Sequence, residues 1–129
     1  MIDRIKEFDL VYLATPYSNY PSGIHRAFVD TARIAARLML AGVRIYSPIC
    51  HTHPMAQFGN IDPLDHEIWM PFDEAMMKAA SALLVAHMVS WSTSKGIRME
   101  MNWFARAGKP ILNLIPETLE VYDCHYTSK

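Results

Sequence analysis

The sequence predicts an α/β protein built on a parallel β-sheet that helices cover on both faces. Short, nearly continuous apolar stretches rich in strand-forming residues recur along the chain. Amphipathic stretches of helical period separate them, and this alternation is typical of parallel sheets with helical crossovers. A length of 129 residues, of which 51% are hydrophobic, fits one domain spanning residues 1–129.

The first half of the chain supplies two strands and one helix. The apolar run "DLVYLAT" (9–15) predicts a strand that ends at the turn-forming cluster "PYSNYPSG". Apolar residues at spacings of three and four predict a helix over 23–41, which Gly42 is placed to end. A second strand follows at 43–49. Residues 50–63 have no period and predict a long loop, a feature that is more often functional than structureless.

The second half continues the alternation. We expect a helix over 64–79 that Pro71 is positioned to interrupt, and then a strongly apolar strand at 81–89. An amphipathic helix begins near Ser94, and "KPILNLI" (109–115) is the next strand. The final residues add at most one short element, which gives a sheet of four to five strands.

Composition excludes several classes of function. The net charge is −1, so the chain lacks the basic excess that binding to a nucleic acid polymer or an anionic membrane requires. The amino terminus does not read as a signal peptide, and the apolar runs are shorter than a membrane span. The two cysteines, Cys50 and Cys124, are too few for a disulfide framework. We therefore expect a soluble cytoplasmic protein.

Polar and aromatic residues gather in three loops that follow predicted strands: "TPYSNY", "CHTHPMAQFGNID" and "SWSTSKG". In parallel sheets the carboxyl ends of the strands meet at one edge, and ligands bind in the crevice outside that edge. The three loops therefore predict a ligand site at this edge of the sheet.

Glu100 stands out because it falls at the edge of the apolar arc of its helix, beside the directions of Phe104 and Ala107. One interpretation is an exposed acid that complements the helix dipole. A second is a buried ion-pair partner of Arg98 or Arg26. A third is a desolvated carboxylate at the mouth of a pocket, where perturbed groups concentrate. Spacing alone leaves all three open.

Asp73 is a second acid on an apolar helix face, in phase with Trp69 and Met76. An acid of this kind is more often a surface residue or an ion-pair partner. Two carboxylates that face inward from different helices are less easily explained in that way. Such a pair suits cleavage of a glycosidic bond, which uses one nucleophile or charge stabiliser and one acid.

Histidines and a cysteine in and after the predicted long loop raise the question of zinc. The spacing of Cys50, His51, His53 and His66 matches no standard structural zinc pattern, so polar residues that contact a ligand are the preferred interpretation. Cys50 has no neighbouring base that would make it a nucleophile. Trp91 is a core or interface residue, or else stacks on a planar base. The familiar glycine-rich phosphate loops are absent from the sequence.

Taken in order, four segments resemble the nucleoside 2-deoxyribosyltransferase superfamily and in particular its DUF1937/DUF4406-like branch. They are "VYLATPYS", "YSPICHTHPMA", "DHEIWMPFDEAMM" and "SKGIRMEMNWFARAGKP". The resemblance implies a flavodoxin-like three-layer sandwich. It also implies that Glu100 is the nucleophile on C1′ of deoxyribose, that Tyr12 holds this carboxylate, and that Asp73 lies near the base. Ser94 occupies a position that is aspartate in typical transferases and serine in the related deoxynucleotide hydrolases.

The expected function is therefore cleavage or transfer at the N-glycosidic bond of a 2′-deoxynucleoside or its monophosphate. The alternative is a domain of the same fold that binds or senses a nucleotide without catalysis. We expect no metal or organic cofactor, and we expect a homo-oligomer, a dimer or tetramer. The expected substrate-binding residues lie mainly in the three strand-end loops: Pro16, Tyr17, Ser18, His53, Trp91, Ser94 and Gly96.

Overall fold

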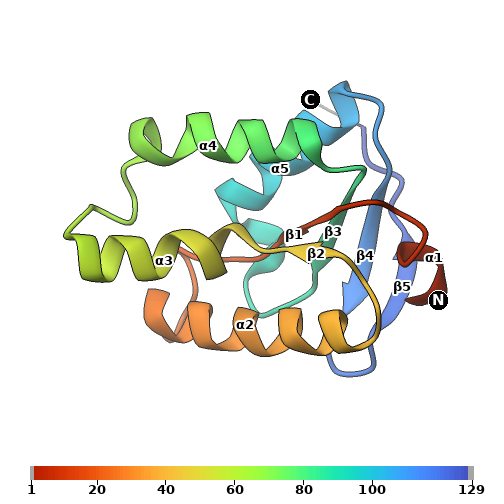
Figure 1. Ribbon diagram of the computed structural model, residues 1–129, viewed down its shortest axis with the longest axis horizontal. Coiled ribbons are helices and arrows are strands. Elements are labelled where there is room, and N and C mark those ends of the chain that lie inside the picture. The colour runs from red at the N-terminus through yellow and green to blue at the C-terminus, as the bar shows by residue number, and fades with distance from the viewer. Residues whose placement is uncertain (1, 128–129) are drawn as a thin grey trace.

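The computed structural model describes residues 2–127 and has a five-stranded sheet with helices packed against it (Figure 1). The strand order is β2-β1-β3-β4-β5. The strands are β1 (Val11–Ala14), β2 (Ile45–Tyr46), β3 (Ala82–Ala86), β4 (Ile111–Ile115) and β5 (Glu120–Asp123). The helices are α1 (Ile2–Ile5), α2 (Ile24–Leu40), α3 (Pro48–Gly59), α4 (His66–Ala79) and α5 (Lys95–Arg106), with a 3₁₀ turn, η1 (Trp91–Thr93), before α5.

The prediction of an α/β protein with a mostly parallel sheet is confirmed. β1 pairs in parallel with β2 and β3, and β3 pairs in parallel with β4. β5 differs, because it runs antiparallel to β4. Only the four residues 116–119 join these two strands, and a connection of that length permits an antiparallel neighbour but no helical crossover.

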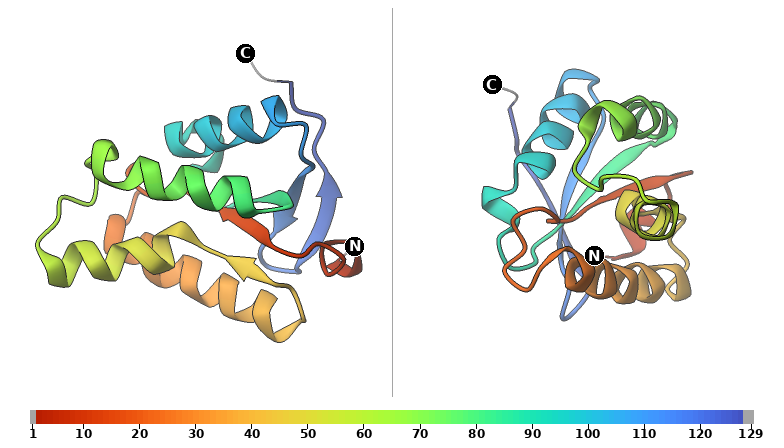
Figure 2. Two further views of the ribbon diagram at one scale, coloured as in Figure 1. Left: turned by 45° about the horizontal axis from the view of Figure 1, so that its top comes forward. Right: turned by 90° about the vertical axis from the view of Figure 1, so that its left-hand side faces the viewer.

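Alternate residues of the strands enter two separate apolar clusters. Val11 and Leu13 of β1 pack in one cluster with residues of α2 such as Leu38. Tyr12 and Ala14 belong to the other cluster, which takes its remaining residues mainly from α4, α5 and β3. Successive side chains of a strand point to opposite faces, so the two clusters lie on opposite faces of the sheet. Figure 2 shows α4 and α5 on one side of the sheet and α2 on the other.

The predicted loop over 50–63 is wrong, because α3 occupies most of it. The helix begins with the start signals of a serine cap and a proline: the Ser47 side chain accepts a hydrogen bond from the Cys50 amide, and Pro48 takes the first helical position. It ends at Asn60, which has the left-handed conformation (φ 55°) common after helices. The apolar period was hidden because one of the inward-facing residues is a histidine, His53.

Two other boundaries differ from the prediction. The strand predicted at 43–49 is reduced to Ile45 and Tyr46, because Ser47 already caps α3. Pro71 does not interrupt α4, which is continuous from His66 to Ala79 and is capped by the Asp65 side chain.

Within residues 2–127, no helix has the length and apolar character needed to cross a bilayer.

Candidate active site

A cavity of about 180 Å³ lies at the carboxyl edge of the parallel strands. Its walls come from the loop after β1, the first turns of α3, the segment before α4, α4 itself and the start of α5. The lining residues are Thr15, Tyr17, Ser18, Pro48, Ile49, Thr52, Pro63, Leu64, His66, Trp69, Met70, Asp73, Ser94, Lys95, Gly96, Met99 and Glu100. The strand-edge location predicted from the polar loops is thus where this cavity lies.

Glu100 is a buried acid of α5 with only 8% of its surface exposed. It lines the cavity one turn after the start of the helix, next to Met99. An exposed acid that complements the helix dipole is therefore excluded as an interpretation. Neither suggested arginine accounts for the burial: Arg26 pairs with Asp30 at 2.9 Å, and Arg98 is exposed.

Two tyrosines lie side by side beneath Glu100. Tyr12 of β1 and Tyr46 of β2 are register partners in neighbouring parallel strands, and partners in register point to the same face. Their ring centroids are 5.6 Å apart. Tyr12 is fully buried. Its hydroxyl approaches the Glu100 carboxyl group and lowers the pKa of that group, although the hydroxyl has no hydrogen bond of standard geometry within residues 2–127.

Asp73 enters the same cavity from α4, half-buried. Burial is the main cause that raises the pKa values of Glu100, Tyr12 and Tyr46, and the charge of ionised Asp73 raises all three further. The predicted pair of inward-facing acids from two helices is therefore present in one cavity.

Burial controls the protonation of this pair. It raises the pKa of Glu100 from its ordinary 4.5 to about 8, with a smaller rise from Asp73 and an opposing effect of Tyr12. Burial also raises the pKa of Asp73 from 3.8 to about 6, opposed by the charges of His51 and His66. At neutral pH these pKa values keep Glu100 mostly protonated and Asp73 mostly ionised.

Polar atoms without partners concentrate around the two acids. Within residues 2–127, four of the six buried side-chain oxygens that make no hydrogen bond belong to this region, namely those of Tyr12, Thr15, Tyr46 and Asp73. Unsatisfied buried polar groups cost about 1–3 kcal/mol each, so a cluster of them needs an explanation. A polar ligand that hydrogen-bonds several of these atoms at once provides one.

The start of α5 forms one end of the cavity. Ser94 caps the helix, because its hydroxyl oxygen accepts a hydrogen bond from the Ile97 amide at 3.2 Å. Ser94, Lys95 and Gly96 all line the cavity. A helix start of this kind offers amide donors and a favourable dipole to a polar or anionic group.

The remaining expected binding residues divide into two groups. Tyr17 and Ser18 line the cavity, whereas Pro16 is buried beside them without lining it. His53 and Trp91 do not line it. His53 is packed behind the cavity, and its Nδ1 atom is 2.6 Å from the Tyr17 hydroxyl oxygen. Trp91 lines a different hollow beyond Ser94, and its ring is stacked on His87 at 3.9 Å.

Metal ligands do not gather in this part of the molecule. Among the residues that the structure describes, no three histidine, cysteine or acidic side chains lie together as a metal site requires. Cys50 is half-buried and the pKa of its thiol is raised by burial, which disfavours the reactive thiolate.

The sequence interpretation missed Tyr46 and Thr52, which accompany the acids in the structure. Tyr46 follows the same apolar-strand pattern as Tyr12, and the pairing of the two strands is the signal that would have found it. Thr52 lies in the segment that was predicted to be a loop.

The fold and the site together define an α/β protein with one buried and one half-buried acid at the carboxyl edge of a mostly parallel sheet. The chain belongs to a family described as a domain of unknown function, DUF1937, whose model matches residues 9–115. This range runs from the start of β1 to the end of β4 and includes every residue named in the site. A comparison with curated proteins gives no match.

Proposed function

We propose that the protein is an enzyme that cleaves the N-glycosidic bond of a 2′-deoxynucleoside or its monophosphate. The observation that carries the proposal is the pair of acids, Glu100 and Asp73, in one cavity with the phenol of Tyr12 beside Glu100. Enzymes that cleave glycosidic bonds commonly use two carboxyl groups, of which one attacks or stabilises the sugar and the other moves the proton.

In the first step a Glu100 carboxylate oxygen forms a bond to C1′ of the sugar as the bond from C1′ to the base nitrogen breaks. The electron pair of the broken bond goes to the base, and the carboxylic acid of Asp73 donates a proton to it. Water then attacks C1′, Asp73 takes the proton of this water, and Glu100 is released as a carboxylate. A second base in place of water gives transfer.

The protonation state that this step requires is a minor one in the free protein. Glu100 must be ionised although its pKa is about 8, and Asp73 must be protonated although its pKa is about 6. At pH 7 about one molecule in ten meets each condition taken by itself. Tyr12 raises the active fraction, because its hydroxyl favours the ionised form of Glu100.

Ser94 favours water over a second base as the acceptor. Its oxygen accepts the cap hydrogen bond from the Ile97 amide, and a serine hydroxyl is too weak an acid to replace an aspartic acid in proton transfer. Among the described residues that line the cavity, Asp73 is then the one acid besides Glu100 and is left to exchange protons with the base. We therefore infer that hydrolysis dominates over base exchange.

The flavodoxin-like three-layer sandwich belongs to the same proposal. Its support is the strand order β2-β1-β3-β4-β5 and the presence of one apolar cluster on each face of the sheet. A homo-oligomer, dimer or tetramer, is also proposed. Its support is the exposure of large apolar side chains such as Phe58 (82%) in α3 and Ile68 (50%) in α4.

The test is a panel of deoxynucleosides and their monophosphates, scored for free base with and without an acceptor base. Glu100→Ala should abolish turnover, and mass spectrometry of the wild type with a 2-fluoro-deoxyribosyl substrate should find a sugar adduct on Glu100. Glu74→Ala is the matched control, because Glu74 is an exposed acid of α4 that pairs with Lys78. Full activity in Glu100→Ala would refute the proposal.

A second candidate is a domain that binds a nucleotide without chemistry. The observation that favours it is the raised pKa of Glu100, because a protonated carboxyl group donates a hydrogen bond but does not attack C1′. In that case nucleotides raise the melting temperature of the wild type, while neither free base nor an adduct is formed.

A further inference from the structure

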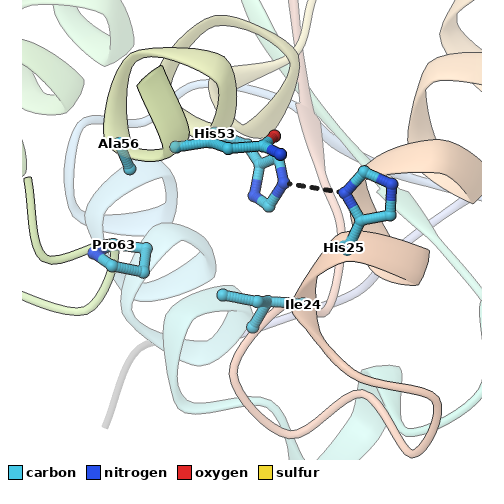
Figure 3. Close-up of a pocket in the computed structure, with 6 residues that line it drawn as sticks. Ile24, His25, His53, Ala56 and Pro63 are labelled. Carbon is cyan, nitrogen blue, oxygen red and sulfur yellow. Dashed lines mark hydrogen bonds between the residues drawn. The ribbon is translucent and has the colours of Figure 1, made fainter. Parts of the chain in front are cut away.

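Three side chains behind the candidate site form a hydrogen-bonded chain. The Tyr17 hydroxyl oxygen is 2.6 Å from Nδ1 of His53, and Nε2 of His53 is 3.4 Å from Nδ1 of His25. Figure 3 shows the two imidazoles facing each other, with His53 coming from α3 and His25 from α2. Tyr17 lines the cavity that contains Glu100, so the chain links this cavity to the region between α2 and α3.

The surroundings keep His53 neutral. His53 is 5% exposed, and its ring is stacked on Phe28 at 4.6 Å. It lines a second cavity with His25 and Pro63, and no described residue that lines this cavity is a lysine, arginine, aspartate or glutamate. Burial and the neighbouring His25 lower the pKa of His53. The described residues that line this cavity therefore favour a neutral imidazole over an imidazolium ion.

A neutral imidazole carries one N–H, so the chain has two complete proton arrangements. In one, Tyr17 donates to Nδ1 of His53, and the Nε2–H of His53 donates to His25. In the other, both hydrogen bonds run the opposite way. The chemistry of the two groups decides between them, because a phenol O–H is a much stronger acid than the N–H of a neutral imidazole, and the unprotonated imidazole nitrogen is a stronger base than a phenol oxygen. The short N···O distance of 2.6 Å agrees with a strong hydrogen bond of this kind. Tyr17 is therefore the donor.

We propose that His53, supported by His25, is a specificity-determining positioning residue that accepts the hydrogen bond of the Tyr17 O–H and so leaves the Tyr17 oxygen to act toward the substrate as a hydrogen-bond acceptor only. This inference rests on the proposed function and specifies its substrate. In this proposal the 5′ position of the sugar faces Tyr17. The 5′-hydroxyl of a nucleoside can donate to such an oxygen, whereas the oxygens of the phosphate dianion that replaces it can only accept. The site thus favours a neutral 2′-deoxynucleoside over its 5′-monophosphate.

Charges in the cavity act on a phosphate in both directions. Asp73, which is mostly ionised at neutral pH, lines the cavity and repels a phosphate dianion. Lys95 and the start of α5 oppose this effect, because they attract an anion. The hydrogen-bonding polarity of Tyr17 therefore affects the balance between the two substrates.

The direction of the chain is tested without any substrate. In ¹⁵N NMR of histidine side chains, an acceptor nitrogen and an N–H nitrogen have widely separated chemical shifts. We expect Nδ1 of His53 to have the acceptor shift and Nε2 the N–H shift at pH 7. The opposite pattern, or an imidazolium, would overturn the inference whether or not the protein is a glycosidase.

Selectivity is tested with 2′-deoxyadenosine and its 5′-monophosphate as probes. We expect the ratio of kcat/KM for the nucleoside to that for the monophosphate to exceed one, and to fall about tenfold in His53→Phe, because Tyr17 then donates into the site. In a Tyr17→Phe background, His53→Phe should have no further effect on the ratio. His125→Phe, which removes an exposed histidine of the carboxyl-terminal segment, is the matched control and should leave the ratio unchanged.

Two further measurements keep failure of the proposed function separate from failure of this inference. Calorimetric binding of the two probes to Glu100→Gln replaces the kinetic ratio if no turnover is found, and stronger binding of the nucleoside supports the inference. If His53→Phe does not fold, His25→Phe removes the second link and should lower the ratio in the same direction. An unchanged ratio in a folded variant, or binding of neither probe, overturns the inference.

Discussion

The raised pKa of Glu100 predicts that the free energy of unfolding depends strongly on pH. The folded-state pKa is about 8 and the ordinary value is 4.5, so the folded chain holds a proton that the unfolded chain has lost between these two pH values. The free energy of unfolding then decreases by about 1.4 kcal/mol for each pH unit over this interval. The contribution of Glu100 is fully present below pH 4.5 and is lost as the pH rises through 8, with a total of about 5 kcal/mol.

The assay is urea unfolding of the wild type and Glu100→Gln at several pH values from about 5 to about 8.5, a range that brackets the titration of the folded protein. The glutamine side chain of the variant cannot ionise, so the difference in unfolding free energy between the two proteins isolates this group from the other titrating residues. We expect the wild type to lose about 4 kcal/mol relative to Glu100→Gln over this range, a large fraction of the roughly 5–15 kcal/mol typical of a domain. A difference that does not change with pH would mean that Glu100 is already ionised in the folded protein, and would refute the reasoning.

Four further predictions follow from single contacts. Tyr12→Phe should raise the pKa of Glu100 further, as measured by ¹³C NMR of its carboxyl carbon, because the hydroxyl that lowers this pKa is lost. Asp73→Asn should lower the same pKa and decrease kcat/KM because the proton donor is lost, and the residual activity should no longer decline above about pH 8. Ser94→Ala should cost about 1 kcal/mol of unfolding free energy by urea denaturation through loss of the α5 cap, while Ser92→Ala should cost less because Ser92 is exposed. Lys109→Met should cost about 1–3 kcal/mol in the same assay, because the Lys109 ammonium donates to three backbone carbonyls at the end of α4, at 2.7, 2.7 and 3.0 Å.

The sequence predicted the parts of the fold that have a clear period. The strand formers around β1, β3 and β4 and the apolar faces of α2 and α5 are patterns that burial alone produces, and the structure has each element near its predicted place. The fifth strand was not predicted as such, because its direction depends on a turn of four residues. The register of the strands could not be predicted from the sequence either, and the pairing of Tyr12 with Tyr46 depends on that register.

The sequence predicted those residues of the candidate site whose positions follow from the phase of a helix. Glu100 and Asp73 were placed by helical phase and lie in one cavity. His53 and Trp91 were placed only by membership of a loop, and both line other hollows instead of that cavity. A loop assignment gives no orientation, whereas helical phase does, so the second pair of residues was less determined by the sequence than the first.

Helix α3, most of which was wrongly predicted to be a loop, also shapes the site. α3 supplies Thr52 to the cavity and His53 to the chain behind Tyr17, and it presents a histidine where a helix of this period normally has an apolar residue. Local rules of sequence are most often broken at functional sites, where a polar residue is retained at a cost in stability. Glu100 breaks the same rule in α5, since an acid lies in the apolar arc of that helix. Both exceptions lie at or directly behind one cavity, so selection for a binding or catalytic site explains them more simply than two unrelated defects in packing.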